Sequence, residues 1–431
     1  MHFLSFSVFA LQAASSALGN PVPQDDAGAT AAAEGVEELA SIAQSAFAKS
    51  EELLNSGDLQ KRGSNCTLGS IKVRKEWGSL TKQERLDYIK AVRCFTSKPA
   101  RTPSEIVPGA KTRFDDFVTT HVNQTFSIHL TGNFLSWHRH YTWLYEEALR
   151  EECGYTGTQP YWDWTKTAIT GLETSPIFDG SETSMSGNGE HVPNQGPLII
   201  ADIDGKEIVR LPTGNGGGCV KSGPFKNFTV NLGPVMLTLP GGGTGANPEG
   251  PFAHNPRCLK RDLTTAINRR YSNASAVIHN ILVPQDIDAF QNEMQGDPTS
   301  PEIGIHAGGH YSFGGDPARD FFTSPGTAFS RKGLKEGKFE RKSTDSKLPG
   351  DPVFYLHHGM VDRLWWIWQM LSPYERQFTD RAVAGTNTFL NMPPSPNTTL
   401  DDFLDYGYAG QGIKIRDAMS TLSGPYCYVY L

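Results

Sequence analysis

The stretch DPVFYLHHGMVDRLWWIWQML, residues 351–371, decides the expected fold. Its first two residues, Asp351 and Pro352, are typical of a helix start. An acidic side chain accepts the free backbone N–H groups there, and proline needs no partner in the first turn. We therefore expect a helix that runs through the tryptophans to about Leu371, with those tryptophans in the core. This helix carries His358.

Two more helices are expected where apolar residues recur at helical spacing. One covers residues 70–94. The other covers residues 136–152, carries His138, and has Gly154 in position to end it. Between residues 171 and 256 the chain is dense in glycine and proline, which predicts long irregular connections with a few short strands.

Composition sets outer limits on fold and function. A chain of 431 residues with 38% hydrophobic residues can bury a substantial core, as one large domain or two smaller ones. The formal charge of -7, without a dense basic stripe, argues against nucleic acid as a partner. Residues 331–347 alternate basic and acidic residues and are expected to form an exposed, mobile excursion.

Histidine spacing predicts a metal centre. Two histidines four residues apart share one face of a helix, so His306 and His310 can bind one ion from one side. Alone, such a pair is a weak signal. Imidazole is a favoured ligand for copper, zinc, iron and nickel, and a site without carboxylate or thiolate donors favours copper. Six histidines have spacings that suit two sites of three imidazoles each, and so predict a dinuclear copper protein: His121, His129, His138, His306, His310 and His358.

The motifs around these histidines resemble those of a known family. The segment FLSWHR, residues 134–139, is similar to the first copper signature of the type 3 copper proteins, and residues 351–362 to the second. This family comprises tyrosinases, catechol oxidases and molluscan hemocyanins. The resemblance spans residues 66–431 and points to the short fungal catechol oxidases and tyrosinases. It implies a mainly α fold, in which an antiparallel four-helix bundle holds the dinuclear copper site, with long loops and a few short strands.

The resemblance also assigns the ligands. It gives His121, His129 and His138 to the first copper and His306, His310 and His358 to the second. His357 is then a neighbour of a ligand, Asp362 is available as outer support for the site, and Phe354 lies close to the metals. The implied cofactor is two copper ions that cycle between Cu2+ and Cu+ and bind O2 between them. Four other histidines are expected on the surface or in packing: His140, His191, His254 and His279.

The family's chemistry is the oxidation of phenols by O2. An o-diphenol leaves as an o-quinone and oxygen ends as water. Hydroxylation of monophenols depends, in the family, on a water held by a Glu and by an Asn directly after the first ligand of the second site. Here Ala307 follows His306, and the Glu position falls on Gln295, with Glu302 as the other candidate. An amide is a poor base-orienting group, so we expect a preference for o-diphenols, with full tyrosinase activity as the alternative.

Two further features bear on the family assignment. Some fungal relatives cross-link a ligand histidine to a cysteine two residues before it. Ser127 holds that place here, so no thioether is expected. Oxygen transport, as in hemocyanin, is the rival function. The chain is expected to be a single catalytic unit without a shielding C-terminal domain, because the segment YCYVYL, residues 426–431, is similar to the tyrosine motif that closes the catalytic core.

The N-terminal region has features of a secreted precursor. Residues 1–19 resemble a signal peptide, with a buried helix as the alternative, and beyond them no run is long and apolar enough to span a bilayer. Residues 20–62 contain few large apolar residues and end in the pair Lys61 and Arg62, which predicts a pro-segment released by a dibasic-specific protease. A solvated charge pair is the alternative. The pro-segment is a candidate inhibitor of a catalytic domain that covers residues 63–431.

The cysteines and the sequons are both typical of a secreted protein. The six cysteines are widely spaced and allow three disulfides in an oxidising compartment, but 15 pairings are possible and the sequence does not choose among them. Five sequons mark candidate glycosylation sites: Asn65, Asn123, Asn227, Asn273 and Asn397. Asn123 is the least favourable of them, because it lies between two expected ligands.

Overall fold

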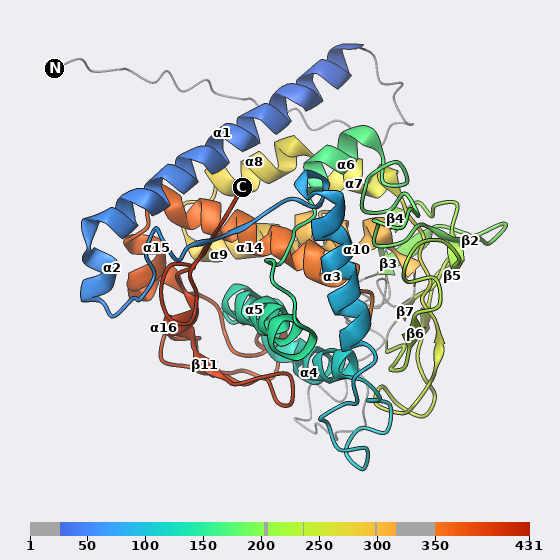
Figure 1. Cartoon of the computed structure of the whole chain (residues 1–431). Helices are drawn as coiled ribbons and strands as arrows, with labels where there is room; N and C mark the ends of the chain where they lie inside the picture. Colours follow the sequence, from blue (N-terminus) through green and yellow to red (C-terminus); the bar gives the residue numbers. More distant parts are fainter. Residues whose placement is uncertain (1–25, 202–205, 236, 298–299, 316–349) are drawn as a thin grey trace.

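The chain is mainly helical. The computed structural model describes residues 26–201, 206–235, 237–297, 300–315 and 350–431. At its centre α5 packs against α4 and α14, and α14 also contacts α10 (Figure 1). These four helices form the expected bundle and have the bounds α4 Arg113–Ile128, α5 Phe134–Cys153, α10 Gly304–Phe313 and α14 Val353–Leu371.

Helix α14 forms as predicted. The Asp351 carboxylate accepts the Val353 N–H at 2.9 Å and so caps the helix, which ends at Leu371. Asp351 is itself buried and forms a two-bond ion pair with Arg261, at 2.7 Å for each bond. The tryptophans of α14 lie in the core, as expected. Helix α5 also forms as predicted, and Gly154 ends it in the left-handed conformation.

The helix predicted over residues 70–94 is wrong in its first half. Residues Lys72–Arg74 form a strand, β1, and Trp77–Ser79 a short 3-10 helix, η1. Helix α3 begins only at Lys82, because Thr81 and Glu84 form a reciprocal capping box that fixes the helix start there. Strand β1 pairs in parallel with the C-terminal strand β12, Tyr428–Tyr430.

The rest of the chain surrounds the bundle with short elements. The predicted irregular connections between residues 171 and 256 are confirmed, since the strands there are two to five residues long. The remaining helices are α3 Lys82–Phe95, α6 Trp164–Thr170, α7 Thr265–Tyr271, α8 Ala274–Leu282, α9 Ile287–Gln295, α15 Glu375–Phe378, α16 Ile415–Ala418, and the 3-10 helices η2 Asp380–Ala382 and η3 Phe389–Asn391. The antiparallel pairs are β2 Gly189–His191 with β5 Gly217–Val220, β3 Leu198–Ala201 with β4 Glu207–Leu211, β6 Thr229–Val230 with β9 Arg257–Cys258, β7 Leu237–Thr238 with β8 Thr244–Gly245, and β10 Phe403–Leu404 with β11 Ile413–Lys414.

A long N-terminal helix, α1 (Asp26–Ser56), is part of the main core. It is followed by the single turn α2 (Asp58–Lys61), and it packs against α14, α8, α6 and β12. Leu39, Ala43 and Ala46 of α1 belong to the same buried cluster as the tryptophans of α14. The segment predicted as a weakly held pro-segment therefore has a buried face.

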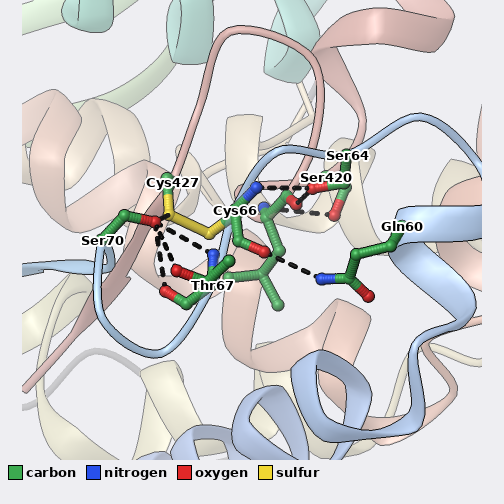
Figure 2. The surroundings of a disulfide bond; sticks show 8 residues. Gln60, Ser64, Cys66, Thr67, Ser70, Ser420 and Cys427 are labelled. Atoms are coloured by element: carbon green, nitrogen blue, oxygen red, sulfur yellow. Dashed lines mark hydrogen bonds between the residues drawn. A yellow bond between two sulfur atoms is a disulfide. The ribbon is translucent and has the colours of Figure 1, made fainter.

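Three disulfides join the six cysteines. Cys66 pairs with Cys427, so the start of the expected catalytic domain is tied to the C-terminal strand region (Figure 2). The other pairs are Cys94 with Cys153 and Cys219 with Cys258. The first of these two bonds ties the ends of α3 and α5 together, and the second lies among the short strands.

Two expectations lie outside the described residues: the signal peptide at residues 1–19 and the excursion at residues 331–347. Within the described ranges, every helix is too short or too polar to cross a bilayer.

Candidate metal centre

Three of the predicted ligands form a first cluster. His121 lies on α4, His129 directly follows α4, and His138 lies on α5. Their ring centroids are 4.9 to 5.4 Å apart, and all three side chains are buried. His129 has an extended backbone conformation, so the middle residue of this cluster lies on a loop, as the family resemblance implies.

The other three form a second cluster that faces the first. His306 and His310 lie one turn apart on α10, and His358 lies on α14. The ring of His358 is 5.2 Å from that of His306 and 5.4 Å from that of His310. Across the two clusters, the rings of His138 and His358 stack at 4.5 Å. The structure thus brings together all six histidines selected from the sequence.

Two rings of the first cluster are held in the tautomer that a metal requires. Nδ1 of His138 lies 2.7 Å from the backbone oxygen of Phe134, and Nδ1 of His129 lies 3.0 Å from that of Thr125. A carbonyl oxygen can only accept a hydrogen bond. Each Nδ1 therefore carries the ring proton and donates a hydrogen bond, and Nε2 keeps its lone pair. Backbone carbonyls of this kind commonly orient metal-binding imidazoles.

His357 is an additional member of the second cluster. Its ring lies 4.1 Å from that of His310 and 5.0 Å from Trp164, and it is buried. Among the described residues neither its ring nitrogens nor those of His358 have a hydrogen-bond partner. Burial lowers the pKa of both rings well below the ordinary value, so both are neutral, the form that binds a metal ion. Sequence reasoning treated His357 only as a neighbour.

The donor set fits copper. Both clusters are made of buried imidazoles, whose nitrogen atoms lie within 4.8 Å of one another in each cluster. Imidazole without thiolate or carboxylate is a donor set that copper accepts well. Of the two adjacent histidines on α14, His358 is the one that stacks on the first cluster, while His357 packs against Trp164.

Aromatic side chains enclose both clusters. Phe354 lies 4.2 Å from His358 and 5.2 Å from His121 between ring centroids, and therefore contacts both clusters. Phe134 lies 4.9 Å from His306 in the same way. These rings keep water away from the histidines. Phe354 thus lies between the histidines of the two clusters, a place consistent with the resemblance.

Gln295, the candidate for the Glu position, lies beside the loop that follows α4. It is the last residue of α9, and its side-chain oxygen accepts the backbone N–H of Leu130 at 2.7 Å, while its amide nitrogen donates to the backbone oxygen of Gln291. Leu130 directly follows His129. The amide is therefore engaged with the backbone beside the first cluster. Glu302 is exposed, and Ala307 is buried on α10.

Asp362 supports the bundle rather than a metal-binding ring. Its carboxylate accepts bonds from Arg139 at 2.5 Å, from Arg74 at 3.3 Å and from the hydroxyls of Tyr428 and Tyr430. Burial alone would raise the pKa of Asp362, but the two guanidinium groups and the hydroxyls hold it below the ordinary value. The outer support for His358 expected from the sequence is corrected accordingly: Asp362 joins α14 to α5, β1 and β12.

The remaining histidines and Ser127 behave as expected. His140 is buried in packing, with its ring nitrogens bonded to the hydroxyl of Tyr426 and the backbone oxygen of Gln411. His191, His254 and His279 are exposed. Ser127 donates to a backbone oxygen of α4, and all six cysteines are in disulfides, which leaves no thiol for a thioether to a histidine.

Comparison with known proteins decides the family. The model of the common central domain of tyrosinase matches residues 111–371, a range that includes all six cluster histidines. The chain belongs to the tyrosinase family. Two curated relatives are each 41% identical: tyrosinase P of Aspergillus terreus, over 83% of this chain and 91% of its own length, and the N-acetyl-6-hydroxytryptophan oxidase of Emericella nidulans, over 85% and 93%.

A solved structure agrees with the fold. A polyphenol oxidase variant from Thermothelomyces thermophila is 43% identical, with a TM-score of 0.79, over 92% of this chain and 98% of the other. The fold of this chain is therefore that of a tyrosinase-family copper oxidase, and its two histidine clusters fit copper binding.

Proposed function

We propose that this tyrosinase-family protein holds two copper ions and uses O2 to oxidise o-diphenols to o-quinones. Two diphenols supply four electrons and four protons, which convert one O2 into two water molecules. The observation that carries the proposal is the convergence of six buried imidazoles into two facing clusters. A bound copper pair supplies the electron transfer between the diphenol and O2.

The chain's own residues support a preference for o-diphenols. Monophenols need a base to remove the phenolic proton, and a carboxylate held beside the clusters is suited to that task. Gln295 supplies an amide, and both ends of that amide are bonded to backbone groups. Glu302, the other candidate from the sequence, is exposed. These placements support the proposed preference for o-diphenols.

Measurement of O2 uptake tests this function. The rate of O2 uptake by the copper-loaded protein is measured with catechol and with tyrosine as substrates. The same preparation is assayed for copper. We expect rapid uptake with catechol, little with tyrosine, and two copper ions per chain. Equal turnover of tyrosine without a lag would support the alternative, a full tyrosinase, for which the relative named tyrosinase P is an argument. No catechol turnover by the loaded protein would remove the proposed function altogether.

A hydroxyindole is a second substrate to test. One relative, 41% identical, is named as an oxidase of N-acetyl-6-hydroxytryptophan, which carries its hydroxyl group on an indole ring. We propose hydroxyindoles as a further substrate class of this chain. Oxygen uptake with 6-hydroxyindole, measured beside catechol at the same copper content, gives the ratio of the two rates. The absence of uptake with 6-hydroxyindole would limit the substrates to diphenols.

A surface hollow is the proposed approach for the substrate. It measures about 790 Å³, and its lining includes Leu130 and Ile305, which flank His129 and His306. The same lining contains the carboxylates of Glu293, Asp297 and Glu302 and one guanidinium, that of Arg270, so acidic groups predominate. Negative charge at the approach favours catechols that carry an ammonium group over those that carry a carboxylate.

We also propose that the protein is secreted and processed. Residues 1–19 serve as the signal peptide, and a dibasic-specific protease cuts after Arg62. Three disulfides support this proposal, because disulfides form and persist in oxidising compartments. N-terminal sequencing of material from the culture medium is the test. A start at Gly63 is expected, and a start at Asn20 alone would contradict the processing.

A further inference from the structure

Helix α1 buries one face from Leu39 to Leu54. The buried residues recur every three or four positions, the spacing of one helix face: Leu39, Ala43, Ala46, Ser50 and Leu54. Leu39 is 1% exposed and Leu54 is 7% exposed. The intervening positions Ala40, Gln44 and Ala48 are exposed. The segment thus has an apolar face that a solvated leader sequence would not need.

This face rests on α8 and α14 (Figure 1). The indole N–H of Trp366, on α14, donates to the hydroxyl of Ser50 at 3.3 Å. Near the other end of the contact, a Cβ atom at Gly35 would lie 2.9 Å from the Cβ of Ala274, at the start of α8. Glycine at this position therefore permits the close approach of α1 and α8.

The dibasic pair lies between two separate anchors. Lys61, Arg62 and Gly63 are exposed. On the N-terminal side Leu59 is 2% exposed, in the main core. On the C-terminal side the hydroxyl of Ser64 donates to the backbone oxygen of Leu422 at 2.6 Å, and the disulfide from Cys66 to Cys427 follows (Figure 2).

Hydrogen bonds also join the two sides of the expected cut. The N–H groups of Gly63 and Ser64 donate to the backbone oxygens of Gln60 and Leu59, at 2.9 and 3.0 Å. The side-chain amide of Gln60 donates to the backbone oxygen of Cys66 at 2.9 Å (Figure 2). The chain has no cysteine before Cys66. After a cut, the N-terminal segment would thus be held by noncovalent contacts alone, and a covalent link cannot account for its retention.

We propose that residues 26–62 stay bound on the surface of α8 and α14 after the bond between Arg62 and Gly63 is hydrolysed. Water adds across that bond and leaves a carboxylate on Arg62 and an amino group on Gly63. The proposal rests on the processing proposed above. It makes the segment a structural subunit of the mature protein rather than an inhibitor that leaves. Trp366 is eight residues beyond His358 on α14, about 12 Å along the helix axis, so the Ser50 contact lies well away from the metal-binding rings.

The test uses the full chain with a recognition sequence for a specific viral protease inserted between Arg62 and Gly63. The cut is then independent of whether processing occurs in the cell, which N-terminal sequencing decides separately. After complete cleavage at micromolar protein, we expect the N-terminal fragment to co-elute with the body in a ratio of about one to one. It should separate in denaturant without a reductant. A fragment that elutes alone while the body keeps its fold overturns the proposal.

A matched pair of variants locates the contact. Ala46 and Ala48 are two residues apart on α1, the first buried and the second exposed. We expect the cleaved Ala46→Glu variant to release its fragment and the cleaved Ala48→Glu variant to retain it. If the uncut Ala46→Glu chain fails to fold, the cleavage experiment on the chain without this substitution decides. Equal release from both variants would overturn the assignment of this face.

Discussion

The side-chain oxygen of Gln295 accepts the backbone N–H of Leu130 at 2.7 Å, so the end of α9 holds the loop that carries His129. Leu130 has a φ of 48°, a conformation that costs a non-glycine residue free energy. Two further hydrogen bonds extend from Gln295. Its side-chain amide donates to the backbone oxygen of Gln291, and the side chain of Gln291 donates to the backbone oxygen of Ala384. A strained residue beside the first cluster is thus fixed by contacts outside it.

Gln295 is therefore predicted to position His129. Substitution Gln295→Leu removes the acceptor of the half-buried Leu130 N–H, at a cost of about 0.5 to 1.5 kcal/mol. We expect copper at the first cluster to be released severalfold faster, up to about tenfold, because 1.4 kcal/mol corresponds to a factor of ten. The measurement is the rate of copper transfer to a chelator, followed by absorbance, together with the copper content of each variant at the start.

Two further variants separate positioning from a role in the reaction. Gln295→Glu keeps an acceptor for Leu130 but loses the donation to Gln291, so an intermediate release rate is expected. Asp288→Asn, at an exposed position of α9 outside the lining of the hollow, should match the unchanged protein. Unchanged copper release from Gln295→Leu, with a changed ratio of tyrosine to catechol turnover, would contradict the positioning role and favour a water-orienting one.

The adjacent histidines of α14 are predicted to differ in their role. His358 stacks on His138 of the first cluster, whereas His357 packs against Trp164. We expect His358→Ala to bind about one copper ion fewer per chain and His357→Ala to keep the full number. Metal analysis after dialysis gives the result, and circular dichroism confirms that each variant is folded. The reverse pattern would assign His357 as the ligand.

Charge at the surface hollow is predicted to affect substrate choice. Glu302 is exposed in its lining. Glu302→Lys reverses this charge, so KM should rise severalfold for dopamine and fall for 3,4-dihydroxyphenylacetate, and the effect should shrink in high salt. Glu249→Lys, at an exposed position between β8 and β9, is the control. If both variants shift KM equally, the hollow is not the approach.

Features with a local signal in the sequence were predictable. The bounds of α14 follow from an acid, a proline and an apolar run that lie next to one another in the chain. The pairing of His306 with His310 follows from the geometry of a single helix turn. The two clusters were found by joining such local signals with the family motifs, and the structure confirms that the six rings converge.

Features that depend on distant partners were not predictable. Residues Lys72–Arg74 form a strand because their partner, Tyr428–Tyr430, lies at the other end of the chain. The bond from Gln295 to Leu130 and the disulfide from Cys66 to Cys427 likewise join distant residues. In α1 the buried face combines the small residues Ala43, Ala46 and Ser50 with Leu39 and Leu54, so its burial depends on the surface that α8 and α14 present to it.

Loss of the Asp362 charge is predicted to destabilise the protein strongly. Asp362 is 3% exposed and pairs with the buried guanidinium groups of Arg74 and Arg139. Removal of one partner from a buried ion pair costs about 3 to 5 kcal/mol, because a charge stays buried without compensation. Urea unfolding of Asp362→Asn at neutral pH should show a loss of this order. Asp401→Asn, at an exposed ion pair with Arg416, should cost less than about 1 kcal/mol.

The contribution of Asp362 to the free energy of unfolding is predicted to decrease in acid. The pKa of Asp362 in the folded protein lies below its ordinary value of 3.8, so folding favours the ionised form. The groups that face it are Arg139 on α5, Arg74 on β1, and Tyr428 and Tyr430 on β12. The stabilisation from its ionisation is therefore complete above pH 3.8 and is lost as the pH falls through the lower folded value. The difference in unfolding free energy between the unchanged protein and Asp362→Asn should be constant from neutral pH to about pH 5 and should shrink in more acidic buffer. A difference that grows as the pH falls would mean that the folded protein raises this pKa.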